Sequence, residues 1–149
     1  MKKQDSLSDQ NSSSRPFLIF KKMWEKDFFS QWMGLELIEA GISTCRLSYR
    51  VRKDMLNGFG MVHGGILFSA SDSAFAFACN SHGRISVALD VSISFTKSAL
   101  LDDQLFVEAI ELHLGKKTAV YDIRTTNHKG ELIALFKGTC YRTSKELDI

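Results

Sequence analysis

The sequence predicts an α+β domain in which a long antiparallel sheet wraps around one buried helix. Residues 65–81 are almost all apolar or small, which is typical of a helix buried on every side. After Gly83, four segments alternate apolar and polar residues and are separated by short turns, as in antiparallel strands. Length agrees with this prediction, because 149 residues make one ordinary domain with a sizeable core.

The N-terminal region divides into a tail and a helix. Residues 1–15 are mostly polar and are expected to form a disordered tail, so that residues 16–149 form the single domain. A first helix is expected from Pro16 to Met33, ended by Gly34. The apolar residues that predict it recur at three- and four-residue spacing: Phe17, Phe20, Met23, Trp24, Phe28 and Trp32.

The remaining elements follow from alternation and turn residues. Two strands are expected at 35–39 and 44–51, joined through Gly41, and a loop at 52–62 leads to the apolar helix. Four further strands are expected at 86–96, 105–113, 118–126 and 132–142. Short turns between these four indicate that successive strands are antiparallel neighbours.

Composition excludes several classes of function. Nineteen basic against 17 acidic residues leave a charge of +2, which is too small to indicate nucleic-acid binding. No apolar run reaches the roughly 18 to 20 residues that cross a bilayer, so no membrane partner is expected. Three cysteines without C-x-x-C spacing and scattered histidines predict neither disulfides nor a metal, and favour a reduced, cytoplasmic protein.

Asp72 is the only charged residue at positions 55–83 apart from the histidines. Burying an ionised group without a partner costs several kcal/mol, so this carboxylate needs a specific explanation. His63-Gly64-Gly65 stands at the start of the same helix, where backbone N–H groups have no helical partner. Together the two features indicate an active site for an acyl group. Two other interpretations remain. The glycine pair could serve only to form the turn, and Asp72 could be satisfied by hydrogen bonds from Ser69 or Ser73.

The chain resembles the hotdog-fold acyl-CoA thioesterases over residues 28–142, and in particular their phenylacetate-degradation (PaaI-like) branch. The motifs that carry the resemblance are Asn57-Gly58-x-x-x-x-His63-Gly64-Gly65 and Gly64-Gly65-x-Leu67-Phe68-Ser69-x-x-Asp72-x-Ala74-Phe75-Ala76. The resemblance implies the hotdog fold and hydrolysis of an acyl-CoA without cofactor. The acyl group it implies is aromatic, of the phenylacetyl type; a medium-chain acyl-CoA is the alternative.

The resemblance also implies the catalytic residues. Asp72 would be the nucleophile or the general base, and burial should raise the pKa of its carboxyl group. Gly64 would donate its amide to the oxyanion, and its missing Cβ would let the thioester approach. Asn57 would bond near the acid or the attacking water, and His63 would hold the turn. Some thioesterases of this type carry a serine at or near position 88 that holds the water, whereas this chain has Ala88.

Substrate-binding residues are expected on both sides of this site. Gly65 and Ser73 adjoin the catalytic positions, and Phe75 could line an acyl pocket or simply pack the sheet. Three lysines could contact the phosphates of coenzyme A: Lys97, Lys116 and Lys117. They could equally be solvated charges at the ends of strands. Where relatives often have Arg-Pro, this chain has Lys97-Ser98.

Spacing along the helix predicts an oligomer. Eight residues of helix rise about 12 Å, whereas an acid and an oxyanion donor must both lie within about 3 Å of the reacting atoms. Gly64 of one subunit should therefore face Asp72 of another, so a homodimer is the minimum, and the resemblance implies dimers paired into a tetramer. The rival hypothesis is a non-catalytic protein that binds or senses acyl-CoA, which could dispense with Asp72.

Overall fold

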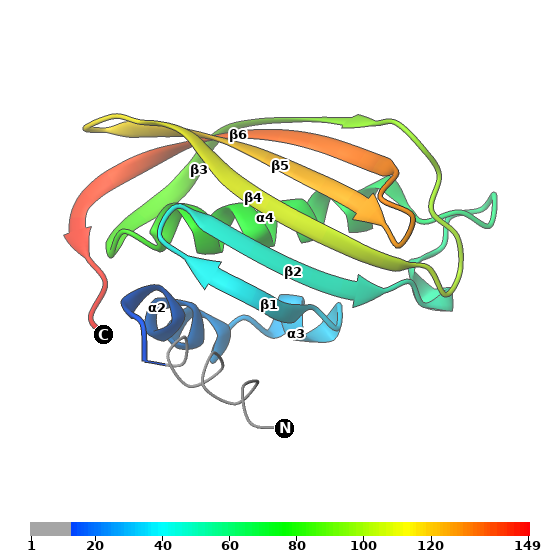
Figure 1. Cartoon of the computed structure of the whole chain (residues 1–149), viewed down its shortest axis with the longest axis horizontal. Helices are drawn as coiled ribbons and strands as arrows, with labels where there is room; N and C mark the ends of the chain where they lie inside the picture. Colours follow the sequence, from blue (N-terminus) through cyan, green and yellow to red (C-terminus); the bar gives the residue numbers. More distant parts are fainter. Residues whose placement is uncertain (1–12) are drawn as a thin grey trace, which may run out of the picture.

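The computed structural model describes residues 13–149 and contains a six-stranded antiparallel sheet curved around one long helix (Figure 1). This helix, α4 (Gly64–Asn80), runs along the concave face of the sheet. The predicted α+β arrangement is confirmed, and it is that of the hotdog fold. Most of the expected tail, residues 1–12, lies outside the described residues; of the remainder, Ser14 is the N-cap of the first helix and Arg15 its first residue.

The expected helix at 16–33 is wrong in one respect, because the chain forms two helices there. These are α2 (Arg15–Trp24) and α3 (Phe28–Trp32). Asp27 makes the break: its carboxylate accepts hydrogen bonds from the backbone N–H of Ser30 (3.0 Å) and from the Ser30 hydroxyl (2.6 Å). An aspartate that caps a new helix stands outside helical geometry, which periodicity does not reveal.

The strands lie close to their expected positions, but their order in the sheet differs. They are β1 (Glu36–Gly41), β2 (Thr44–Arg50), β3 (Arg84–Phe95), β4 (Gln104–Leu114), β5 (Thr118–Asn127) and β6 (Leu132–Glu146). A short 3-10 helix, η1 (Lys53–Met55), follows β2. The spatial order is β1-β2-β4-β5-β6-β3, so β3 pairs with β6 and not with β4 as expected.

The connection from β3 to β4 explains this difference. Three strand spacings separate β3 from β4, a distance of about 14 Å. Residues 96–103 could span roughly 26 Å if extended, so they cross the end of the sheet without strain. Sequence alternation shows which side chains share a face of a strand, but it does not show which strand lies beside it.

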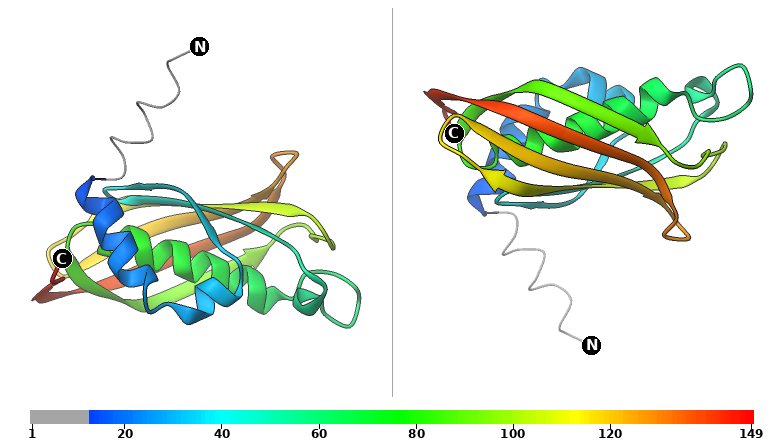
Figure 2. Two further views of the ribbon diagram at one scale, coloured as in Figure 1. Left: turned by 90° about the horizontal axis from the view of Figure 1, so that it is seen from below. Right: turned by 90° about the horizontal axis from the view of Figure 1, so that it is seen from above.

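Small residues let α4 approach the sheet closely. Ala70, Ala74 and Ala78 are fully buried along one face, but Ser69, Asp72, Ser73 and Ala76 are only partly buried, so α4 is not buried on every side as expected. The ring of Phe75 packs on Gly138 of β6, where an added Cβ would lie 2.8 Å from the ring. Helix α2 packs against both α4 and the edge strand β1, and α3 contacts α4 through the Ser30 and Ser73 hydroxyls (Figure 2). No helix in residues 13–149 has the length and apolarity needed to cross a membrane.

Candidate active site

The turn before α4 is fixed by His63. This residue is the N-cap, and its ring Nδ1 accepts a hydrogen bond from the Gly65 N–H at 2.8 Å. Its backbone N–H donates to the carbonyl of Met55 (2.8 Å), which anchors the turn to η1. The next N–H groups of the helix, at Ile66 and Leu67, donate to the His63 carbonyl.

Gly64 and Gly65 therefore differ in a way that the sequence does not reveal. The Gly65 N–H is occupied by His63, so the prediction that this amide is available to a ligand is wrong. The Gly64 N–H has no hydrogen-bond partner within residues 13–149. A free N–H at a helix N-terminus is a strong site for negative charge. Of the two glycines, Gly64 is the available donor.

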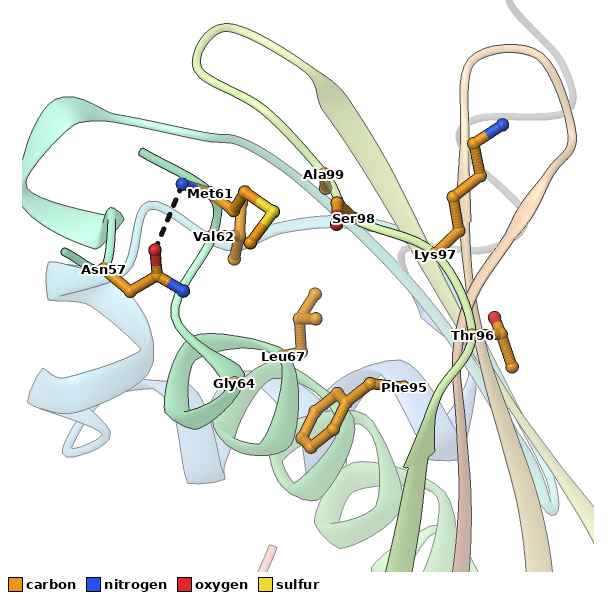
Figure 3. Close-up of a pocket in the computed structure, with 10 residues that line it drawn as sticks. All are labelled: Asn57, Met61, Val62, Gly64, Leu67, Phe95, Thr96, Lys97, Ser98 and Ala99. Carbon is orange, nitrogen blue, oxygen red and sulfur yellow. Dashed lines mark hydrogen bonds between the residues drawn. The ribbon is translucent and has the colours of Figure 1, made fainter. Parts of the chain in front are cut away.

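A pocket of about 440 Å³ opens beside Gly64 (Figure 3). Asn57 enters it from the preceding loop: its side-chain Oδ1 accepts hydrogen bonds from the backbone N–H groups of Phe59 (2.9 Å) and Met61 (3.2 Å). Its Nδ2 has no partner in the part of the chain that the structure describes. The apolar part of the lining consists of Met61, Val62, Leu67, Phe95 and Ala99.

Asp72 lies two helical turns further along α4 and does not line this pocket. Its carboxyl group is half-buried and makes no hydrogen bond to the described residues. Neither serine satisfies it, because the Ser69 hydroxyl donates to the Gly65 carbonyl (2.7 Å) and the Ser73 hydroxyl bonds that of Ser30 (2.8 Å). Burial raises the pKa of Asp72, as expected from its surroundings. An acid with a raised pKa and free oxygens can accept a proton from water.

Two predicted substrate contacts are not supported by the geometry. Phe75 is 1% exposed and packs against Tyr121 and Phe136, so the ring belongs to the core and cannot reach a substrate. Ser73 turns toward α3, where its hydroxyl is held by Ser30. Ser73 follows Asp72 directly in sequence, but successive helical residues point in different directions, so it does not share the space that Asp72 faces.

The three lysines do not come together in one chain. Lys97 lines the pocket beside Gly64 and forms an ion pair with Glu131. Lys116 and Lys117 lie in the β4–β5 turn, at the opposite end of the molecule (Figure 1). A shared phosphate site is therefore not built by a single chain. Among the described residues, no cluster of three His, Cys, Asp or Glu could hold a metal ion.

Sequence reasoning missed Phe95, whose ring lies against Gly64 in the pocket. Its signal was present, because it ends the alternating run of β3, but alternation alone assigns such a residue to packing. Ala88 lies on the same strand, paired with Cys140, and carries no hydroxyl for a water molecule.

Residues 59–134 match the family described as the thioesterase superfamily. The chain is 38% identical over 120 residues to the acyl-coenzyme A thioesterase PaaI of Escherichia coli, covering 80% of this chain and 86% of that one. The structure of the E. coli PaaI protein from the phenylacetic acid degradation operon has a TM-score of 0.87 and 34% identity, covering 90% and 97% of the two chains. A hypothetical thioesterase from Streptococcus pneumoniae, solved with coenzyme A, has a TM-score of 0.79 and 28% identity, covering 85% and 98%.

Proposed function

The chain belongs to the thioesterase superfamily and is a thioester hydrolase, and we propose that it cleaves an acyl-CoA at a site shared by two subunits. One observation carries the proposal. A free backbone donor at Gly64 and a free side-chain donor at Asn57 border one pocket, while the free acid, Asp72, lies on the same helix outside that pocket. Donors and acid are both unsatisfied, but one chain does not bring them together.

The proposed chemistry assigns a role to each group. The Gly64 N–H, with Asn57 Nδ2 beside it, binds the thioester oxygen as negative charge develops there; such a donor is typically worth about 3 to 4 kcal/mol. Asp72 of the second subunit removes a proton from the attacking water; alternatively it attacks the carbonyl carbon itself, and water then hydrolyses the resulting mixed anhydride to release the free acid and regenerate the carboxylate. The carbon–sulfur bond breaks, and coenzyme A leaves as the thiol after receiving a proton. No metal or organic cofactor takes part in this scheme.

An open sheet edge supports the dimer. The edge of β3 that does not face β6 has no strand partner within the described chain. This strand also exposes Val87 (52%) and Leu89 (62%), and long apolar edge strands invite pairing with a second chain. A two-fold dimer repeats every contact, so it contains two sites. Pairing of dimers into a tetramer remains part of the proposal through the family resemblance.

The substrate that we propose is an aromatic acyl-CoA of the phenylacetyl type. Its support is the similarity to the E. coli PaaI protein, together with the apolar lining of the pocket. A medium-chain acyl-CoA would fit the same machinery and is the alternative. We place the enzyme in the cytoplasm, and its free thiols at Cys45, Cys79 and Cys140 agree with a reducing compartment.

A non-catalytic acyl-CoA sensor is the second candidate function. A sensor needs the pocket and the donors, but it has no use for an unpaired, partly buried carboxyl group, so Asp72 favours the enzyme. Free-thiol release measured with phenylacetyl-, benzoyl-, hexanoyl- and acetyl-CoA separates the two candidates. Turnover with phenylacetyl-CoA as the best substrate supports the proposal. Tight binding of acyl-CoA without thiol release would establish the sensor.

Subunit mixing tests the shared site. Gly64→Pro removes the N–H donor, and Asp72→Ala removes the acid, so each homodimer should be inactive. A mixed dimer contains one site with both defects and one with neither, and should recover about half of the wild-type activity. Differently tagged subunits, refolded together and purified through both tags, provide the sample. Absence of recovery in such dimers would mean that both residues act within one chain.

A further inference from the structure

The ring of Phe95 occupies the place where a side chain on Gly64 would begin. A Cβ added to Gly64 would lie 3.0 Å from Cζ of Phe95, and 3.4 and 3.5 Å from the two Cε atoms. The tip of the ring therefore faces the glycine. Figure 3 shows the ring alongside the first turn of α4, bordering the pocket.

Phe95 is held there by its backbone. It is the last residue of β3 and pairs with Ala134 of β6. The next residue is fixed as well, because the Thr96 N–H donates to the Ile133 carbonyl (2.9 Å) and the Thr96 hydroxyl to the Leu132 carbonyl (2.6 Å). A rigid strand end thus presents the ring to Gly64.

Packing in the hydrophobic core does not explain why a phenylalanine stands at position 95. Phe95 remains 55% exposed, whereas the core aromatic Phe136 of the neighbouring strand is fully buried. Burial of so exposed a ring contributes little to folding. What distinguishes Phe95 is its contact with the one glycine of the turn whose N–H is free.

This contact changes the explanation of Gly64. The sequence suggested a glycine there so that the thioester could approach the backbone. In the structure, the space on the Cβ side of Gly64 is filled by Phe95, so the glycine is required by a neighbouring side chain. The substrate oxygen must reach the N–H from another direction, through the pocket.

We propose that Phe95 is a positioning residue for thioester hydrolysis; this inference rests on the proposed function. The ring holds the first turn of α4 so that the Gly64 N–H stays directed at the thioester oxygen. It also covers one side of the donor against water, where a low local dielectric strengthens the hydrogen bond to the oxyanion. A small displacement of this donor is sufficient to slow the reaction, since misplacement by 1 Å can cost about 100-fold.

The first test uses Phe95→Tyr, which is ordinarily a conservative change. Because Cζ points at Gly64, the new hydroxyl is directed into the glycine and must displace the turn or the ring. We expect kcat for the preferred acyl-CoA to fall roughly 10-fold or more with little change in KM. Phe95→Leu withdraws the tip of the side chain from Gly64 and removes the cover of the ring, so kcat should fall by a smaller factor, about three- to 10-fold. The matched control is Phe28→Tyr on α3, where the ring is 72% exposed and the rate should not change.

The second test approaches the same contact from the glycine. Gly64→Ala keeps the N–H but places a methyl group against the ring, so kcat should fall roughly 10- to 100-fold. Adding Phe95→Leu removes the obstruction and should return kcat to about the level of Phe95→Leu alone, which independent structural roles of the two residues would not do. Gly58→Ala is the control, because a Cβ there meets no atom within 4 Å.

The outcomes are distinguishable. A rate loss in Phe95→Tyr, together with rescue of Gly64→Ala by Phe95→Leu, supports the inference. A wild-type kcat in Phe95→Tyr, or no rescue in a double variant that unfolds at the wild-type temperature, overturns it while thioester hydrolysis stands. Failure of the wild-type enzyme to release thiol from every acyl-CoA tested overturns the proposed function and this inference with it.

Discussion

The two ends of α4 use the same kind of side chain in opposite ways. At the C-terminal end, Asn80 is fully bonded: its Nδ2 donates to the carbonyls of Ala76 (2.9 Å) and Ser86 (3.0 Å), and its Oδ1 accepts from the Ser86 N–H (2.9 Å). At the N-terminal end, Asn57 Nδ2 and the Gly64 N–H have no partner in residues 13–149. Of these two asparagines only Asn57 keeps a free donor, and it lies with the Gly64 N–H beside the pocket, which is why we place the proposed chemistry at that end.

A cluster near the C-terminal end reinforces the contrast. His82 Nε2 lies 2.7 Å from Glu111 Oε2 and 3.0 Å from the Ser43 hydroxyl, and the Tyr121 hydroxyl donates to Glu111 at 2.5 Å. The residue types resemble a Ser-His-acid triad. However, one ring nitrogen of His82 contacts both neighbours, whereas a triad needs a separate nitrogen for each. This cluster joins α4 to the sheet, and catalysis is not expected from it.

Removal of the free acid should have the largest effect. Asp72→Asn is expected to lower kcat by about 10²- to 10⁴-fold, because the proton acceptor is lost. Since burial raises the pKa of Asp72, its charge destabilises the folded chain. The variant should be slightly more stable than wild type at pH 7, and this gain should vanish as the pH falls through the raised pKa to below about 3.9.

Rates and urea denaturation of the purified variant provide the measurement. Asp102→Asn is a suitable control, because Asp102 is exposed at φ 68°, a conformation that asparagine also adopts. An Asp72→Asn enzyme with near-wild-type kcat would remove the acid from the mechanism.

Loss of the free side-chain amide donor of Asn57 should have the second-largest effect on the rate. Asn57→Asp keeps the oxygen that bonds Phe59 and Met61, but replaces the Nδ2 donor with negative charge beside the developing oxyanion. We expect kcat to fall about 100-fold while the unfolding free energy changes by less than about 0.5 kcal/mol. Asn127→Asp is the matched control, since Asn127 holds the β5–β6 turn through the same two kinds of backbone bond. Equal rates in the two variants would contradict a catalytic role for Asn57.

At the C-terminal end of α4, replacing the asparagine should reduce stability and leave the rate unchanged. Asn80→Ala leaves the Ser86 N–H and carbonyl without their partners and should lower the unfolding free energy by about 1 to 3 kcal/mol. The activity of the remaining folded enzyme should be unchanged. Urea denaturation and kcat at 25 °C separate these effects. A reduced kcat at full stability would break the contrast between the two ends.

The smallest expected effect is the loss of stability when Glu111 is replaced by glutamine. Burial raises its pKa, but hydrogen bonds from Tyr121 and His82 and the charge of His82 outweigh burial, so the pKa is lowered overall. A lowered pKa in the folded state contributes stability above the unfolded value of about 4.3 and loses it as the pH falls. Glu111→Gln should therefore cost about 1 kcal/mol at pH 7 and progressively less below about pH 4. A difference that stays constant from pH 7 to pH 3 would contradict this assignment.

The sequence by itself determined the local elements and the chemistry-bearing turn. Helix α4 and the strand segments lie within a few residues of their expected bounds, and Asp72 lies on α4 after the His63 turn as expected. These features are readable because periodicity, turn residues and helix caps act over a few neighbouring residues.

Only the tertiary structure decided which of these residues meet. The place of β3 beside β6, the separation of Lys116 from Lys97, and the contact of Phe95 with Gly64 all depend on residues far apart in the chain. The difference between Gly64 and Gly65 depends on one ring nitrogen of His63. Local patterns specify which face a side chain occupies, but the partner on that face is chosen by packing of the whole domain, which no short stretch of sequence encodes.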